Sequence, residues 1–106
     1  KEVQSFLSSI YSSDYNTAYG NFSSQLKEVQ DQDTFESAIE SVKYAGLNSD
    51  SKTNWTTNSV SSSTNTGNTK EIGGTIDCSD SKFDALFKLV EQNGSYKLYG
   101  YSIKVQ

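Results

Sequence analysis

The sequence predicts an α+β domain in which three N-terminal helices pack on one face of a curved, mainly four-stranded antiparallel sheet. Apolar residues in the first half of the chain recur every three or four positions, as they do on one side of a helix. In the second half they alternate with polar residues, and turn sequences separate the alternating runs. The 106 residues suffice for a single core, so we expect residues 1–106 to form one domain.

Two helices are expected before residue 23. The first covers residues 2–12, and its apolar stripe carries Val3, Phe6, Leu7, Ile10 and Tyr11. The polar residues 12–14 offer side-chain oxygens that can cap a second, short helix. That helix repeats the same spacing with Tyr15, Ala18, Tyr19 and Phe22. Residues 23–32 contain few apolar anchors, which predicts an irregular segment or a brief helical turn.

A third helix is predicted from Asp33 to about Tyr44. Asp33 and Glu36 have the spacing of a capping box. In this motif each of the two side chains accepts a hydrogen bond from the backbone N–H of the other residue. Its apolar face carries Phe35, Ala38, Ile39 and Val42. Gly46 suits the left-handed conformation that commonly follows a helix end.

The first strand is predicted in residues 48–63, which are rich in Thr. Trp55 and Val60 have opposite parity there, so they share a face only if a β-bulge lies between them. Residues 64–68 are a predicted hairpin loop, in which Gly67 can adopt a positive φ. We expect a long, twisted hairpin arm that projects beyond the helices. A low-complexity linker over residues 57–68 is the alternative.

Three further strands are predicted over residues 69–79, 83–92 and 96–105. Helix-facing positions of the middle strand are Phe83, Ala85, Phe87 and Leu89, and we expect Phe35 and Ile39 in the same core. Leu86 and Val90 on the other row indicate that the outer face is also partly covered. In the last strand the apolar positions change parity at Gly100, which signals a bulge.

Two further expectations concern the strand at 69–79. Gly73 and Gly74 predict either strong bending or the close approach of a helix. Cys78 shares strand parity with Ile72 and Ile76, which predicts a buried and unreactive thiol.

The charged residues argue against several classes of function. Nine Lys, no Arg and thirteen acids give a net charge of −4, so we expect no nucleic-acid partner. The chain has no His and one Cys, which leaves no imidazole base, thiolate zinc site or paired-cysteine redox site. We therefore predict no catalytic residue, no metal ligand and no cofactor. No segment has the roughly 20 apolar residues of a membrane span.

Several segments carry a family resemblance. They are the run 6–19 with its Ser-Asp-Tyr-x-x-Ala-Tyr break, the start Asp33-x-Phe35, the single Trp55, and the closing Gly-Ser-Tyr-Lys-Leu-Tyr-Gly-Tyr-Ser-Ile at 94–103. Together they resemble the nuclear transport factor 2-like superfamily (ketosteroid isomerase-like, cystatin-like), in particular its small exported bacterial members. The resemblance implies a cone whose helices and concave sheet enclose a pocket. Members serve as enzymes, ligand binders, immunity proteins or assembly domains, so fold does not select function.

The isomerases of this superfamily use an Asp base with a Tyr and a protonated acid as oxyanion donors inside the pocket. In this chain we expect the strand acids to face solvent, so none carries over to that role: Glu71, Asp77, Asp84 and Glu91. The resemblance therefore does not extend to a catalytic residue.

Two hypotheses follow for the function. The first is a non-enzymatic extracytoplasmic binding or assembly domain, periplasmic or at the cell surface, such as the soluble part of a lipoprotein; the Ser-, Thr- and Asn-rich composition favours export. The alternative is a small-molecule pocket binder or vestigial isomerase-like enzyme. Its candidate pocket-lining residues are Tyr15, Tyr19, Trp55, Phe83, Phe87 and Tyr101. Tyrosines packed in the core, with hydroxyls at its edge, are the competing interpretation.

The expected partner is accordingly an unidentified protein or a small apolar ligand. The chain would act either as a monomer or as a homodimer that associates through its sheet.

Overall fold

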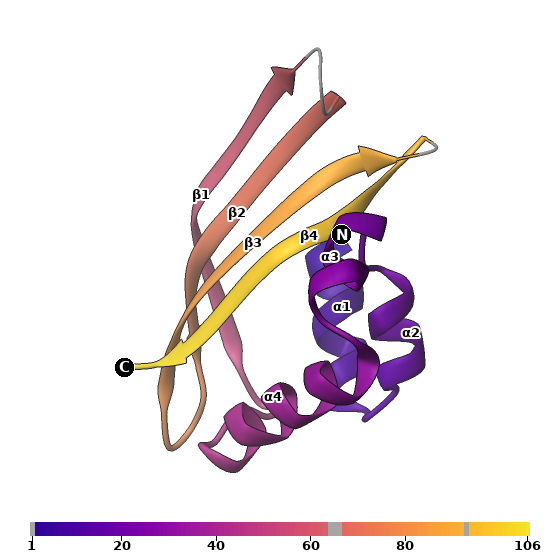
Figure 1. The fold of residues 1–106 in the computed structure, drawn as a ribbon. Coiled ribbons are helices and arrows are strands. Elements are labelled where there is room, and N and C mark those ends of the chain that lie inside the picture. Colours follow the sequence, from indigo (N-terminus) through magenta and orange to yellow (C-terminus); the bar gives the residue numbers. More distant parts are fainter. Residues whose placement is uncertain (1, 64–66, 93) are drawn as a thin grey trace.

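The computed structural model describes residues 2–63, 67–92 and 94–106, in which helices precede an antiparallel sheet (Figure 1). The helices are α1 (Glu2–Tyr11), α2 (Tyr15–Gly20), α3 (Ser24–Val29) and α4 (Gln32–Tyr44). The strands are β1 (Lys52–Ser63), β2 (Gly67–Asp77), β3 (Lys82–Gln92) and β4 (Ser95–Val105). The strands pair in chain order, β1-β2-β3-β4. The α+β class and the four-stranded antiparallel sheet are confirmed.

The described chain has four helices, not three, because the segment expected to be irregular or a brief helical turn contains the six-residue helix α3. Ser23 makes this helix start possible: its side chain is fully buried, and its Oγ accepts from the Leu26 N–H at 3.2 Å. A buried hydroxyl that satisfies an end N–H stabilises even a short helix. The apolar spacing of α3 is too brief to reveal it in the sequence.

Helix α4 begins earlier than the predicted start at Asp33. Asp31 caps it, since its Oδ1 accepts from the Thr34 N–H at 2.8 Å, and this hydrogen bond lowers the pKa of the Asp31 carboxyl. Asp33 lies in the first turn instead. At the other end Gly46 has φ 124°, as predicted.

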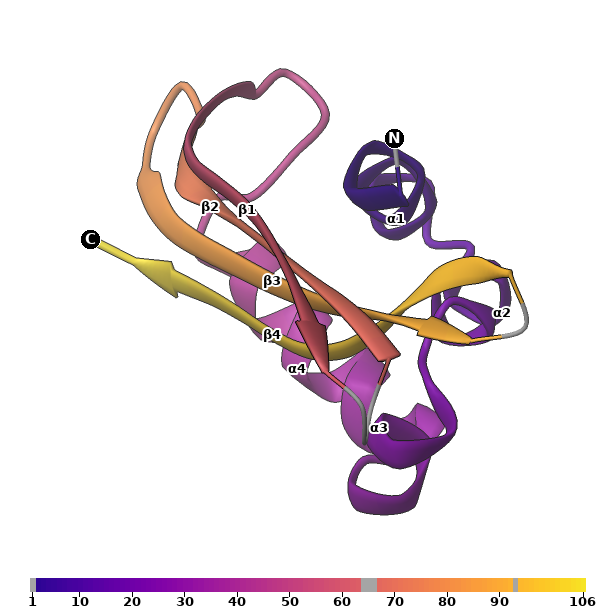
Figure 2. The same ribbon diagram turned by 90° about the horizontal axis from the view of Figure 1, so that it is seen from above.

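All four helices lie on one side of the sheet (Figures 1 and 2). The inner row of β3 faces them and is buried: Phe83, Ala85, Phe87 and Leu89. Phe35 and Ile39 of α4 belong to the same core, as predicted. The β1–β2 hairpin continues past the helices, so the predicted projecting arm is present (Figure 1). Gly67 already begins β2, and residues 64–66 of the predicted loop lie outside the described residues.

The bulge signalled at Gly100 is present, and a bulge also lies between Trp55 and Val60, where the sequence left that question open. In β4, Gly100 pairs with Lys88 and Leu98 pairs with Leu89, which leaves Tyr99 as the extra residue. In β1 the register shifts between Trp55 and Thr57. The extra residue of a bulge returns the side chains that follow it to the face used before it. Trp55 and Val60 therefore both lie on the side of the sheet that carries the helices.

Two local expectations need correction. The close neighbour of Gly74 is the backbone of β1 and not a helix: an added Cβ would lie 2.0 Å from the Asn54 carbonyl oxygen. Cys78 follows the end of β2 and is only partly buried, because the chain turns there and the Cys78 N–H donates to the Ser81 carbonyl oxygen at 2.8 Å.

Candidate functional site

The structure places the six predicted pocket residues around the aromatic part of the core. Phe83 and Phe87 are fully buried. The other four are partly buried and pack against the core: Tyr15, Tyr19, Trp55 and Tyr101. The Trp55 ring meets the Phe87 ring edge-on, with centroids 5.9 Å apart.

Rings from the helices occupy the space between these residues. Phe6 of α1 lies 5.9 Å from Phe87 and 6.0 Å from Tyr101 between ring centroids. The ring centroid of Phe35 in α4 lies 6.1 Å from the ring centroids of both Tyr15 and Tyr101. These contacts agree with tyrosines that pack in the core, whereas a ligand pocket behind them stays a prediction.

The tyrosine hydroxyls sit at the rim of this cluster and have protein partners. Tyr101 donates to the Gln30 side-chain oxygen at 2.9 Å, and Tyr19 donates to the Gln30 carbonyl oxygen at 3.3 Å. Tyr11 and Ser51 share a hydrogen bond of 2.9 Å. Burial raises the pKa of both Tyr11 and Tyr101, so these hydroxyls stay protonated near neutral pH. In this structure they serve as hydrogen-bond donors or acceptors to protein groups at the rim of the core.

Lys43 connects α4 to the end of α1. Its Nζ donates to the Ile10 carbonyl oxygen at 3.0 Å and to the Ser13 Oγ at 2.9 Å. The same Nζ lies 3.2 Å from the Tyr15 hydroxyl, which donates to Glu40. A cation that satisfies a helix-end carbonyl is a common stabilising device. This polar cluster has a structural explanation.

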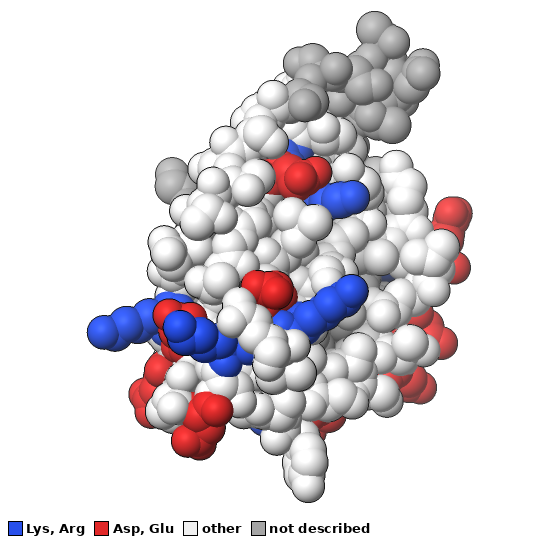
Figure 3. Space-filling model, turned by 90° about the vertical axis from the view of Figure 1, so that its left-hand side faces the viewer, with Lys and Arg blue, Asp and Glu red and all other residues white. Residues whose placement is uncertain are grey.

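The acidic residues of the sheet lie at or near the surface. Asp84 and Glu91 are exposed, and Glu71 and Asp77 are partly buried. Within residues 2–63, 67–92 and 94–106, no group of three or more Asp, Glu or Cys side chains is placed to hold a metal ion. Figure 3 shows Lys and acidic side chains intermixed on the face turned away from the helices. Neither sign of charge forms a continuous patch in that view.

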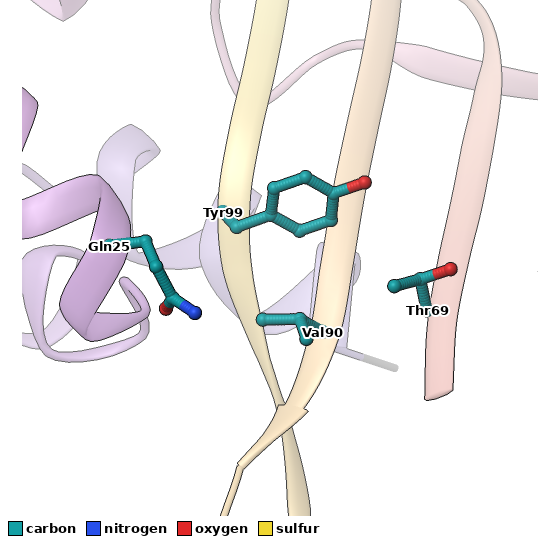
Figure 4. A pocket seen from close by; sticks show the side chains of 4 residues that line it. All are labelled: Gln25, Thr69, Val90 and Tyr99. Carbon is teal, nitrogen blue, oxygen red and sulfur yellow. The ribbon is translucent and has the colours of Figure 1, made fainter. Parts of the chain in front are cut away.

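A small hollow on the outer face was missed by sequence reasoning (Figure 4). It measures about 180 Å³ and is lined by Gln25, Thr69, Val90 and Tyr99. The bulge turns the Tyr99 ring across β3, and Val90 is only 3% exposed although it lies on the outer row. The parity change at Gly100 was the available signal. With no charged side chain in its lining, the hollow offers only a contact surface.

Strand β1 forms one edge of the sheet, and among the described residues no strand pairs with its outer side. Glu71 and Thr69 of β2 pair with Ser59 and Ser61. The Gln106 N–H donates to the Lys82 carbonyl oxygen at 2.8 Å, so the even-numbered residues of β3 direct their main-chain groups toward β4 and the odd-numbered ones toward β2. The β2–β3 pairing has no register shift, so the odd-numbered residues of β2, including Thr69 and Glu71, direct theirs toward β1. The main-chain N–H and C=O of Val60 therefore point away from the sheet.

The side chains of β1 do little to block that edge. Lys52 begins the strand, and residues 53–63 carry no charge and no Pro. Val60 is 59% exposed. Beyond the bulge, residues 57–63 pair with β2 without a further register shift and carry no charge, and residues 57–60 are exposed.

Comparison with protein-family models, curated proteins and solved structures finds no match to this chain. None of the helices described is long and apolar enough to cross a membrane. Inference about function therefore rests on the geometry of the residues themselves.

Proposed function

We propose that the protein is a non-enzymatic, extracytoplasmic binding or assembly domain that contacts a partner protein by strand addition at β1. The observation that carries this proposal is the uncharged free edge at residues 57–63. In strand addition the main chain supplies the hydrogen bonds, so no special side chains are needed. A Ser- and Thr-rich arm suits that role, since small side chains do not obstruct an incoming strand.

Exposed sheet edges are normally protected against pairing with other chains, so an unprotected edge suggests a binding role. Proteins use Pro, inward-pointing charges, bulges or covering segments to prevent edges from pairing with other chains. On β1 the bulge at Thr56 protects only the part of the strand near the helices. The unprotected part lies on the arm that projects past the helices (Figure 1). We infer that this part is kept open for a partner.

The alternative function, a small-molecule pocket or vestigial enzyme inside a cystatin-like cone, has weaker support. Phe6 and Phe35 contact the residues predicted to line such a pocket. A ligand there would have to displace aromatic rings that bury large apolar areas. The extracytoplasmic location is supported by the Ser-, Thr- and Asn-rich composition alone.

Substitution of Val60 by Pro tests the proposal. Pro removes the outward N–H and leaves the β1–β2 hydrogen bonds in place, because Pro is tolerated on edge strands where its nitrogen faces solvent. Tagged wild-type and Val60→Pro chains are incubated with the native envelope fraction, and the captured proteins are compared. The expected result is a stable partner that the variant fails to retain.

Tyr44→Ser is the matched control, since Tyr44 is an exposed apolar residue on α4, away from β1. It should retain the partner. Equal capture by all three chains, with Val60→Pro folded by circular dichroism, contradicts strand addition at β1. A partner-free homodimer that the Pro variant disrupts assigns the edge to a second copy of the chain instead.

A further inference from the structure

The other edge of the sheet is occupied over only part of its length. Residues 21–23 lie beside β4 as a short parallel strand, in which Phe22 bridges to Leu98. The Ser23 N–H donates to the Leu98 carbonyl oxygen at 2.6 Å, and the Leu98 N–H donates to the Asn21 carbonyl oxygen at 2.7 Å. The chain then turns into α3 at Ser24. This leaves the rest of the β4 edge without a neighbouring strand among the described residues.

The open part of β4 runs from Tyr101 to Val105. The bond from the Gln106 N–H to the Lys82 carbonyl oxygen shows that even-numbered residues of this segment bond to β3. Tyr101, Ile103 and Val105 therefore direct their main-chain groups away from the sheet. Among the residues that the structure describes, no strand lies beside them on that side.

A groove follows this open edge. Its volume is about 400 Å³, and helix α3 forms one wall. The lining residues are Leu26, Val29, Gln30, Gly100, Tyr101, Ser102, Ile103 and Lys104. Leu26 and Ile103 are buried, whereas Val29 is 80% exposed and Val105, at the end of the strand, is 55% exposed. The Tyr101 hydroxyl donates to the side-chain oxygen of Gln30, the residue that follows α3, at 2.9 Å, which fixes the end of the helix against β4.

We propose that this groove binds an extended peptide segment of a partner protein, which adds to β4 as a fifth strand in line with residues 21–23. The edge already accepts an extended segment at Leu98, so the added strand continues an existing interaction. Lodging a strand between a sheet edge and a helix combines main-chain hydrogen bonds with side-chain pockets. The exposed Val29 and the buried Leu26 are the apolar residues of the helix wall.

The lining sets the chemistry of the peptide. Side chains of a strand alternate between faces, so one set in the peptide faces Leu26, Val29 and Ile103 and must be apolar. The other set lies beside Ser102 and Lys104 on the outer face. Lys104 is the only charged residue among those that line the groove, although the chain carries a net charge of −4. An acidic residue in the outer set is therefore the electrostatic complement.

This site is separate from the proposed β1 site, because β1 and β4 are opposite edges of one sheet. The two proposals therefore fail or succeed independently. Loss of binding at one edge, with the other intact, distinguishes them.

The probe is the capped peptide Val-Asp-Val-Asp-Val, titrated to about 1 mM, the weak end of specific binding, into isotope-labelled protein. NMR shifts are expected at the amides of residues 101–105 and 26–30, together with slower hydrogen exchange at Ile103. A peptide of the same sequence with N-methyl groups on alternate residues lacks the donors and should not bind. Val29→Glu should weaken binding by about tenfold or more, because it replaces apolar contact with an acid facing an acidic peptide.

Val60→Glu is the matched control, because it introduces the same charge at an exposed valine on the opposite edge. It should bind the peptide like the wild type. The proposal is overturned by any of three results: no shifts at the highest concentration, shifts confined to residues 57–63, or binding that persists with the N-methylated peptide. A peptide-independent dimer with its interface at 101–105 also overturns it, since the occupant would then be a second copy.

Discussion

At the scale of single residues, a few positions decide how the strands fit together. Gly74 faces the bulge of β1, where the Trp55 Cα would lie 2.8 Å from any added Cβ. Gly73, its neighbour, faces the flexible end of the Leu86 side chain instead, at 3.1 Å. The two adjacent glycines thus have different roles. Gly74 lets the backbone of β1 approach closely, and Gly73 leaves room for the Leu86 side chain.

We predict that Gly74→Ala destabilises the protein by more than about 2 kcal/mol, because a rigid backbone cannot move away from the new methyl group. Gly73→Ala should cost less than about 1 kcal/mol, since the Leu86 side chain can change rotamer. Urea unfolding of both variants measures the difference. Equal losses of unfolding free energy would show that the β1 bulge does not depend on Gly74.

At the scale of secondary structure elements, the two edge strands differ in how they are covered. Residues 21–23 cover the start of β4, and α3 stands beside the remainder. Strand β1 has no covering segment among the described residues, and only its bulge interrupts pairing. The hairpin arm is correspondingly poor in core contacts: its strands continue past the ends of the helices (Figure 1), and Val60 is 59% exposed. The arm is thus an appendage of the sheet rather than part of the core.

A shortened arm tests this description. Ser61 and Thr69 are paired, so an Asn-Gly turn between them replaces residues 62–68 and keeps every β2–β3 pair. The unfolding free energy should change by less than about 1 kcal/mol, because residues 62–68 contain no large apolar side chain and the hydrogen bond from Asn68 to Glu91 is exposed to solvent. Thermal and urea unfolding measure the change. A loss several times larger would show that the arm supports the core.

At the scale of the whole molecule, one aromatic core joins helices and sheet. Phe6, Phe35, Phe87 and Tyr101 come from four different elements and contact one another through their rings. The molecule measures 43 × 30 × 19 Å, so a thin layer of helices suffices to cover the inner face of the sheet. Stability of the whole therefore depends on keeping this central layer apolar and uncharged.

The tyrosines at the rim predict how stability responds to alkaline pH. Burial raises the folded-state pKa of Tyr11 and Tyr101 above the usual value of about 10. Their contribution is fully present below the unfolded pKa and is lost as pH rises through the folded values. We expect the unfolding free energy to fall as pH rises above about 10, and Tyr101→Phe to reduce that fall.

The comparison needs a control for effects of alkaline pH that do not involve Tyr101. Tyr44→Phe changes an exposed tyrosine and should leave the pH dependence as in the wild type. Urea unfolding across the range, for the three chains, provides the measurement. A parallel fall in the wild type and in Tyr101→Phe would mean that the Tyr101 hydroxyl is not responsible.

Local pattern was sufficient for most of the fold. Alternation identified the inner row of β3, and the parity change at Gly100 predicted the bulge at Tyr99. For β1 the sequence showed only that Trp55 and Val60 need a bulge to share a face, and the structure has one at Thr56. The cap of α4 was misplaced, because Asp31 and Asp33 both fit a cap and only the geometry of Thr34 distinguishes them. The burial of Cys78 was overestimated, because strand parity does not say where a strand ends.

The sequence by itself determined the class, the order of the strands and which residues face the core, because side-chain periodicity is a property of neighbouring residues. Only the tertiary structure decided which edges stay open and where grooves form. The hollow at Val90 and the groove at Ile103 each combine α3 with strands far along the chain. Such surfaces depend on the distances between segments remote in sequence, and no local pattern encodes those distances.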